Sequence, residues 1–221
     1  MPDLRTTQLD LDSNIIDLGI GQPGFDLLPL DLIRDAAERR LSQGDRAFLN
    51  YGYEQGDGRF RQLLAQFLQR HTASEVLPEN LMITCGASQG LDMICTHFAR
   101  SGDTIFVEEP SYFLALRIFA DRGLNVVGVP TDAQGLRLDA LQELLARQQP
   151  AFLYTVPTFQ NPSGVTLPAV RRSELLRLAQ EHNFFVVADE VYQLLDYSAS
   201  PPPPMAHFGG EERLLSLGSF S

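Results

Sequence analysis

The sequence predicts an α/β protein whose core is a mainly parallel sheet with helices on both faces. Short apolar runs, typical of buried strands, alternate along the chain with segments whose apolar residues recur at helical spacing. Strands joined by helices in this way run parallel and bury both faces of their sheet. With 221 residues, 44% of them hydrophobic and 20% charged, the chain has the size and composition of a globular protein with a sizeable core.

The expected elements follow from these patterns. Strands are predicted over 81–85, 103–108, 125–131, 151–156, 184–188 and 214–217. Helices are predicted over 88–100, 112–122, 138–148 and 168–182. Pro168 suits the first turn of the last helix, because a residue there donates no intrahelical hydrogen bond.

The first 75 or so residues do not follow this alternation. Segments 30–41 and 58–71 have helical spacing and flank a loop with several glycines and tyrosines. We therefore expect residues 1–50 to form an N-terminal arm and the start of a small domain, and residues 51–221 to form the sheet domain. Segment 198–204 ends in four consecutive prolines, which is typical of a short exposed polyproline connector.

Charge and composition limit the partners and the location. The net charge of −11 argues against nucleic acid or an anionic membrane as the main partner. No apolar run approaches the length of a membrane span, and residues 1–13 do not resemble a secretory signal, so we expect a cytoplasmic protein. Cys85 and Cys95 form no CxxC motif, and we expect them to be buried thiols rather than a disulfide or a metal site.

A glycine-rich segment at 19–24 matches the GxGxxG pattern of dinucleotide-binding proteins. In such a site the third glycine lies in the first turn of a helix, whereas here Pro29 and a loop precede any helix. The segment is better interpreted as a loop whose bare backbone approaches a ligand closely.

Segment 84–90, with the sequence TCGASQG, follows a predicted strand and begins a helix. Small residues at this point leave backbone N–H groups free to bind a phosphate, and the helix dipole assists. Many turns in α/β proteins are rich in glycine and serine without binding anything, so this motif alone leaves both interpretations open.

Two further motifs follow predicted strands. The sequence NPSG at 161–164 comes after the strand that ends at Val156, where it could also be a simple turn. The sequence DEVY at 189–192 ends the strand 184–188, at the position where parallel sheets place ligand-facing carboxylates. The alternative for Asp189 is a helix N-cap.

In their order and distances, these motifs and the SFS sequence at 219–221 resemble the class I/II (fold type I) aminotransferases, and particularly the 2-aminoadipate and kynurenine aminotransferase type. The resemblance extends from Leu18 to Ser221, about the first half of a family member. It implies pyridoxal 5′-phosphate as the cofactor. Residues 51–221 would then be the incomplete cofactor-binding large domain of a fold type I PLP-transferase.

The resemblance also implies roles around the cofactor ring. Asp189 matches the aspartate that pairs with the pyridine nitrogen and keeps it protonated, so that the ring can accept electrons. Tyr192 matches the phenol that binds the 3′-oxygen of the cofactor, and Asn161 matches the amide that shares this oxygen. Tyr112 matches the aromatic side chain stacked on the ring.

Other matches concern the phosphate. The helix start that binds it corresponds to Ala87, Ser88 and Gln89. Ser219 and Ser221 flank the site from the last strand, with Ser219 the expected phosphate ligand of the two.

Two N-terminal residues complete the match. Tyr51 corresponds to a loop residue that reaches the phosphate of the partner subunit, which implies a homodimer with shared active sites. Gly21 corresponds to the loop whose backbone approaches the substrate carboxylate.

The chain also departs from the family pattern. All 17 basic residues are arginine, and the lysine that would carry the cofactor is expected immediately after Ser221. No catalytic residue is therefore assigned within the chain, and the C-terminal small domain with its carboxylate-binding arginine is absent from it. Without that lysine we expect the 221-residue chain to be inactive by itself. Of the two explanations, a piece of a longer protein cut at the cofactor lysine and a true truncated product, we expect the first.

The resemblance implies a transaminase that moves an amino group from an L-amino acid to a 2-oxo acid in a ping-pong cycle. A C–S lyase of the same fold uses the same cofactor residues and is the first alternative. The effector domain of an aminotransferase-like transcription regulator would need a winged-helix domain, for which residues 1–14 leave no room. A non-catalytic relic that binds the cofactor weakly, or only dimerises, is the remaining alternative.

Overall fold

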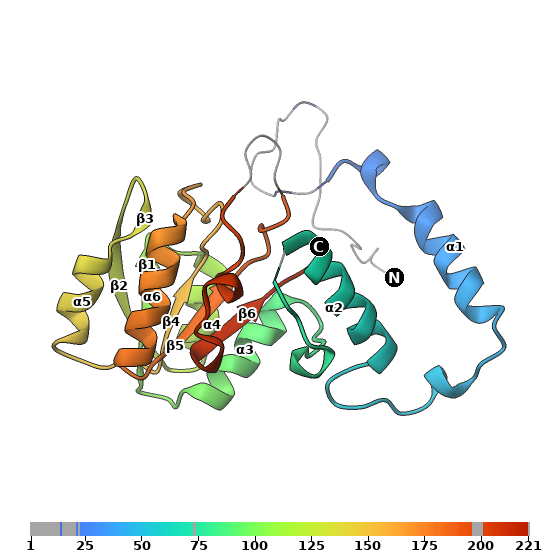
Figure 1. Cartoon of the computed structure of the whole chain (residues 1–221), viewed down its shortest axis with the longest axis horizontal. Helices are drawn as coiled ribbons and strands as arrows, with labels where there is room; N and C mark the ends of the chain where they lie inside the picture. Colours follow the sequence, from blue (N-terminus) through green and yellow to red (C-terminus); the bar gives the residue numbers. More distant parts are fainter. Residues whose placement is uncertain (1–13, 15–20, 22, 73, 196–200, 221) are drawn as a thin grey trace. The chain divides into compact units, whose positions relative to one another are not determined.

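The computed structural model describes residues 14, 21, 23–72, 74–195 and 201–220 (Figure 1). The chain divides into two compact units, Met1–Tyr51 and Gly52–Ser221. The first contains helix α1 (Leu30–Leu41), and its described side chains are exposed apart from the half-buried Arg40. The second contains the sheet and the motifs at 84–90, 161–164 and 189–192.

The sheet has six strands in the order β3-β2-β1-β4-β5-β6. The strands are β1 (Thr104–Glu109), β2 (Asn125–Asp132), β3 (Gly135–Leu136), β4 (Phe152–Thr155), β5 (Phe185–Asp189) and β6 (Leu214–Leu217). Neighbouring strands are parallel except for β2 and β3. The predicted mainly parallel sheet is confirmed; β3 is too short to leave a pattern in the sequence.

Helices cover both faces of this sheet, as predicted. In the sheet unit they are α2 (Gly58–Thr72), α3 (Ala87–Phe98), α4 (Phe113–Asp121), α5 (Leu138–Leu145) and α6 (Ala169–Glu181). Apolar residues of α3 and α4 pack in one buried cluster with Val107, Tyr154 and Val187. Residues of α5 and α6 pack in a second cluster with Phe106 and Leu153. Because adjacent residues of a strand point to opposite faces, the two clusters lie on opposite sides of the sheet.

The predicted strand at 81–85 is wrong. This segment joins no sheet, and the backbone N–H of Ile83 bonds to the carbonyl of Gln55 instead. Met82 is half exposed and Cys85 is exposed, so the segment does not bury its apolar residues as a central strand would. It runs extended between the short 3-10 helix at Pro78–Asn80 and α3.

Two smaller expectations also need correction. Cys95 is buried as expected, but Cys85 is exposed, because it lies in the turn before α3 rather than in a strand. Pro204 is buried and Pro201 to Pro203 are half-buried, so the described part of the polyproline segment is not an exposed connector. The carbonyls of Pro202 and Pro203 accept hydrogen bonds from Gln193 and Arg172, which hold this segment against the sheet unit.

Two general features bear on the kind of site to expect. No helix in the described part of the chain is long and apolar enough to cross a membrane. Among the same residues there is no group of three or more histidine, cysteine, aspartate or glutamate side chains that could hold a metal ion.

Candidate functional site

The candidate site lies at the carboxyl ends of the central strands. After β1 the chain crosses through α4 on one face of the sheet, and after β4 it crosses through α6 on the other face. Because β1 and β4 are neighbours, the loops that follow them diverge, and in α/β sheets such a switch point is where a ligand crevice forms. Tyr112 follows β1, Asn161 follows β4, and Asp189 ends β5 next to β4.

Asp189 is the buried acid of this crevice. Its side chain is 7% exposed, and its Oδ2 accepts a 2.7 Å hydrogen bond from the hydroxyl of Tyr154. Tyr154 and Val187 are register partners, so Asp189, two residues after Val187, faces the same side of the sheet as Tyr154. Burial raises the pKa of Asp189, and interactions with the hydroxyl of Tyr154 and with the backbone N–H of Val191 oppose this rise. The chain therefore contains a costly buried carboxyl group at the mouth of the crevice.

Two buried side-chain oxygens lack a hydrogen-bond partner among the described residues, one just after β1 and the other at the end of β5. They are Oδ1 of Asp189 and Oγ of Ser111, which precedes Tyr112. Buried polar atoms in folded proteins nearly always have partners, so the orphaned carboxyl oxygen of Asp189 is suited to a polar ligand. For Asp189 Oδ1 that ligand must supply an N–H or O–H donor.

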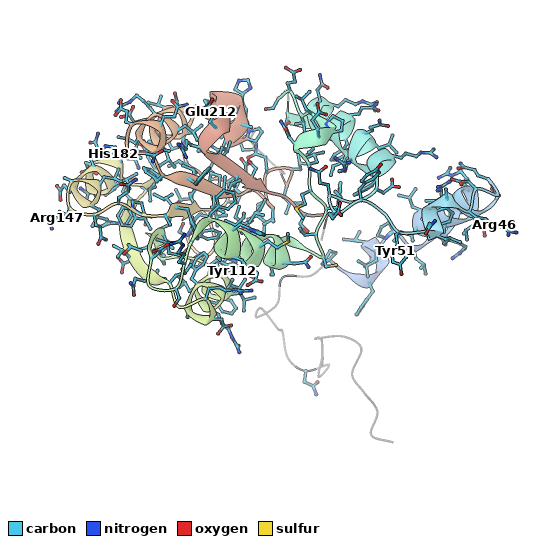
Figure 2. All side chains as sticks on the ribbon, turned by 90° about the horizontal axis from the view of Figure 1, so that it is seen from below. Arg46, Tyr51, Tyr112, Arg147, His182 and Glu212 are labelled. Atoms are coloured by element: carbon cyan, nitrogen blue, oxygen red, sulfur yellow. The ribbon has the colours of Figure 1, made fainter. Side chains whose placement is uncertain are left out.

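Aromatic and amide groups surround this acid. Burial raises the pKa of Tyr112, and the charges that Tyr192 and Asp189 can carry raise it further. These three side chains are therefore close enough to interact electrostatically. Tyr112 caps the start of α4 and is half-buried (Figure 2). The Nδ2 of Asn161 lies 3.5 Å from the hydroxyl of Tyr192, at the limit of a hydrogen bond. Because this contact is weak, the amide of Asn161 and the hydroxyl of Tyr192 can both bind a third polar atom instead.

The start of α3 presents backbone N–H groups that the helix itself does not use. Gly86 precedes the helix with φ 87° and ψ 165°, a conformation that is essentially restricted to glycine. Ala87, Ser88 and Gln89 form the first turn, whose N–H groups have no acceptor within the helix. A Cβ at Gly90 would lie 2.9 Å from Leu217, so the first turn packs closely on the end of β6, and Ser219 follows two residues later.

The described residues thus suit a flat ligand with three polar ends. One end donates a hydrogen bond to Asp189, a second is an oxygen for Asn161 and Tyr192, and the third is an anion for the start of α3. Tyr112 offers an aromatic face for the body of such a ligand.

Comparison with known proteins agrees with this geometry. The sequence profile of aminotransferase class I and II matches residues 13–221. The chain belongs to this family. It is 34% identical to aromatic-amino-acid aminotransferase 1 of Thermococcus litoralis, over 95% of the chain and 51% of the relative.

Solved structures of the family have the same fold. A multiple substrate aminotransferase from Thermococcus profundus superposes with a TM-score of 0.86 and 35% identity, over 95% of this chain and 53% of that one. LysN, an α-aminoadipate aminotransferase from Thermus thermophilus complexed with N-(5′-phosphopyridoxyl)-L-leucine, gives a TM-score of 0.80 and 33% identity, over 91% and 51%. The chain therefore spans about half the length of the family members that it matches.

The predicted site residues differ in where they lie. Six of them follow the strands or begin α3 as expected: Ala87, Ser88, Gln89, Tyr112, Asn161 and Asp189. Tyr192 lies in a turn after β5, so Asp189 does not begin a helix, and Ser219 follows β6. Gly21 and Tyr51 are exposed residues of the N-terminal unit, which is described by itself, and their roles stay predictions. Ser221 lies outside the described residues.

A second group of buried polar residues is not evident from the sequence patterns. By pattern alone Tyr154 is one more apolar residue of a strand, although a tyrosine on a fully buried strand needs a partner for its hydroxyl. Glu108 interrupts the apolar run of β1 and is 1% exposed. Its Oε1 accepts a hydrogen bond from Thr155 Oγ1 and its Oε2 accepts one from the backbone N–H of Val156, both of 2.9 Å. Glu108 thus joins the ends of β1 and β4 on the face of the sheet opposite to Asp189. Burial raises the pKa of Glu108 to about 7.

Proposed function

We propose that this chain is the cofactor-binding portion of a pyridoxal-phosphate-dependent aminotransferase, which transfers an amino group from an L-amino acid to a 2-oxo acid in a ping-pong cycle. The observation that carries the proposal is the buried, unpartnered Oδ1 of Asp189, in a crevice that also contains Tyr112, Asn161 and Tyr192. A protonated pyridine nitrogen supplies an N–H donor of the kind that this oxygen lacks. When bound, the cofactor supplies an electron sink for cleavage of a bond at the substrate Cα.

The residues of the chain then have distinct tasks. Asp189 holds the proton on the ring nitrogen, and Tyr154 keeps the carboxylate in place through its other oxygen. Asn161 and Tyr192 donate to the 3′-oxygen, while Tyr112 packs on the ring. Binding of the phosphate is assigned to the first turn of α3, namely Ala87, Ser88 and Gln89, together with Ser219.

Covalent attachment and proton transfer at the substrate are assigned to no residue of this chain, since it contains no lysine. We expect the 221-residue chain to bind the cofactor without catalysing transamination. Binding is therefore measured with pyridoxamine 5′-phosphate, the amine form of the cofactor, which needs no lysine to bind.

A homodimer with shared active sites is part of the proposal. Supporting it, the N-terminal unit exposes large apolar side chains, among them Leu30, Leu32 and Ile33 of α1. A helix with such residues in contact with water is stabilised when a second surface covers it. Tyr51 and Gly21 would act from this unit, on the phosphate and on the substrate carboxylate.

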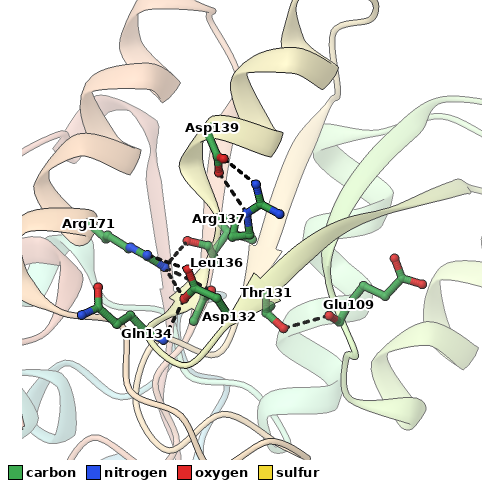
Figure 3. A network of polar contacts seen from close by, with 9 residues as sticks. Glu109, Thr131, Asp132, Gln134, Leu136, Arg137, Asp139 and Arg171 are labelled. Carbon is green, nitrogen blue, oxygen red and sulfur yellow. Dashed lines mark hydrogen bonds and ion pairs between the residues drawn. The ribbon is translucent and has the colours of Figure 1, made fainter.

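Calorimetric titration with pyridoxamine 5′-phosphate tests the cofactor site. The change Asp189→Ala should weaken binding by about tenfold to a hundredfold, because a charge-assisted hydrogen bond is lost. Asp139→Ala is the matched control, since Asp139 is an exposed carboxylate that pairs with Arg137 away from the crevice (Figure 3). Equal affinity in the Asp189→Ala variant and the wild type would refute the site.

Product analysis of the complete protein separates the transaminase from its alternative. A C–S lyase uses the same cofactor residues but releases a thiol, ammonia and a 2-oxo acid from a sulfur-containing amino acid. Amino transfer to an added 2-oxo acid, without release of thiol, is the result that the proposal expects.

A further inference from the structure

Two consecutive arginines at the start of α6 have opposite environments. Arg171 points to the outer edge of the sheet, where it forms two 2.8 Å hydrogen bonds with Asp132 and also donates to the carbonyls of Gly135 and Leu136 (Figure 3). Arg172 is 0% exposed and belongs to the buried interior. Only Arg172 is turned toward the loops of the candidate site.

The guanidinium of Arg172 is held by oxygens of three chain segments. Nη2 donates to the carbonyl of Pro157 at 2.7 Å and to Oγ1 of Thr158 at 2.8 Å. Nη1 donates to the carbonyl of Pro203 at 3.0 Å and lies 3.5 Å from Oε1 of Gln193. Nε donates to the carbonyl of Leu167 at 2.8 Å.

A second layer of hydrogen bonds ties these segments together. The hydroxyl of Thr158 accepts from Arg172 and donates to Oε1 of Gln193 at 2.6 Å. Nε2 of Gln193 donates in turn to the carbonyl of Pro202 at 2.8 Å. Arg172 is thus the hub of a network that joins the loop after β4 to the segments after β5.

These two loops carry the pair proposed to bind the 3′-oxygen of the cofactor. Asn161 lies three residues after Thr158, and Tyr192 directly precedes Gln193. A fully buried guanidinium is costly, and here its donors meet neutral carbonyl, hydroxyl and amide oxygens. An apolar side chain would fill the same space without that cost, but it could not fix two loops at a set separation.

We propose that Arg172 is a positioning residue that sets the separation of Asn161 and Tyr192, and thereby the grip of the site on the 3′-oxygen of the cofactor. The inference rests on the proposed function for the identity of the ligand. Arg172 itself touches no part of the cofactor in this assignment, and acts only through the two loops.

A double-mutant cycle with pyridoxamine 5′-phosphate as the probe tests this inference. Arg172→Gln and Tyr192→Phe should each weaken binding, by about tenfold for the loss of one or two hydrogen bonds. The double variant should have the same affinity for the probe as the single variant with the lower affinity. Both changes remove the contact between Tyr192 and the 3′-oxygen of the cofactor, so the second change has nothing further to remove. Binding of inorganic phosphate should be unchanged in all three proteins.

Arg171→Gln and Arg172→Lys complete the design. Arg171→Gln should bind the probe as the wild type does, since Arg171 contacts β2 and β3 and neither of the two loops. Arg172→Lys should not restore binding, because an ammonium on a flexible stem cannot span both loops as the planar guanidinium does. If Arg172→Gln does not fold, the same cycle is run with Arg172→Lys.

Hydrogen exchange gives a readout that needs no ligand. Peptides covering 157–167 and 190–195 should exchange faster in Arg172→Gln than in Arg171→Gln, while peptides of β1 and β2 stay protected. Additive losses of affinity in the cycle, or unchanged exchange in both loops, would overturn the inference. If the wild-type protein does not bind pyridoxamine 5′-phosphate, the proposed function is wrong. Hydrogen exchange in the two loops would then still show whether Arg172 holds them together.

Discussion

The hydroxyl of Tyr154 donates a 2.7 Å hydrogen bond to Oδ2 of Asp189, from the strand next to the one that Asp189 ends. This bond fixes one oxygen of a buried carboxyl group and leaves the other, Oδ1, without a hydrogen-bond partner among the described residues. A carboxyl group held in this way is preorganised, since the orientation of its free oxygen is set before any ligand arrives.

Tyr154→Phe should therefore destabilise the protein. The phenyl ring fits the same apolar cluster, but Oδ2 of Asp189 loses its donor, at a cost of about 1–3 kcal/mol in the free energy of unfolding. The loss should be greater at pH 8 than at pH 5, because removing this bond raises the pKa of Asp189 further and penalises its charged form. Urea unfolding at both pH values measures this, with Tyr112→Phe as a control that breaks no bond to Asp189. A Tyr154→Phe protein as stable as the wild type at pH 8 would contradict the assignment.

Glu108 gives the stability of the protein a dependence on pH. Its pKa is about 7 in the folded chain against 4.5 for the free group, so between these values the folded state binds more protons than the unfolded state. Its contribution is complete below pH 4.5 and is lost as the pH rises through 7, at up to about 1.4 kcal/mol per pH unit.

Glu108→Gln should remove this dependence. The amide can accept from the N–H of Val156 and donate to Thr155, so the variant should gain stability over the wild type as the pH rises from 5 to 8. Urea unfolding at pH 5, 6, 7 and 8 follows the difference. Glu109→Gln changes the adjacent exposed carboxylate and should leave the wild-type curve intact. Parallel curves for Glu108→Gln and the wild type would show that Glu108 does not titrate in this range.

The sequence predicted strands β1, β4 and β5 to within two residues, because each contains at least three consecutive apolar residues and is buried on both faces. The segment 81–85 has a similar pattern but no neighbouring strand to pair with in the described chain. Pairing is a tertiary property, so local composition cannot distinguish a paired strand from an extended linker.

The site shows the same division between local and tertiary information. Asp189, Asn161 and Tyr112 were predicted from the resemblance of their motifs to those of the aminotransferase family, and each lies at or after the end of a strand. The bond between Tyr154 and Asp189 depends on the register of β4 against β5, which a single sequence does not reveal. Arg171 and Arg172 are indistinguishable in the sequence, and only their rotation about the helix axis sends one to Asp132 and the other to the site loops.

The two cysteines should differ strongly in reactivity. Burial raises the pKa of Cys95 to about 11, whereas Cys85 is exposed in the turn before α3. Because the thiolate is the reactive form, iodoacetamide at pH 8 should label Cys85 faster by about two orders of magnitude. Peptide mass spectrometry after timed labelling measures both rates, and labelling in concentrated urea should make them equal. Comparable rates in the folded protein would show that the interior around Cys95 opens readily.

Gly86 connects backbone conformation to ligand binding. It precedes α3 with φ 87°, and a Cβ added there would meet no atom within 4 Å, so a substitution acts through backbone strain alone. Gly86→Ala should lower the free energy of unfolding by about 1–3 kcal/mol. Strain relieved by a shift of the first turn would also move the N–H groups of Ala87, Ser88 and Gln89, which are proposed to bind phosphate.

Gly102 provides the matched control, since it has φ 92° and equally open surroundings in the turn before β1. Gly102→Ala should cost a similar amount of stability, measured by urea unfolding, yet leave the affinity for pyridoxamine 5′-phosphate unchanged. Gly86→Ala should weaken that affinity, and should weaken the binding of inorganic phosphate in parallel, because both ligands share the same anion site. If the two variants lose stability equally and bind both ligands like the wild type, the start of α3 is not the phosphate site, and Ser219 and the N-terminal unit become the places to look for it.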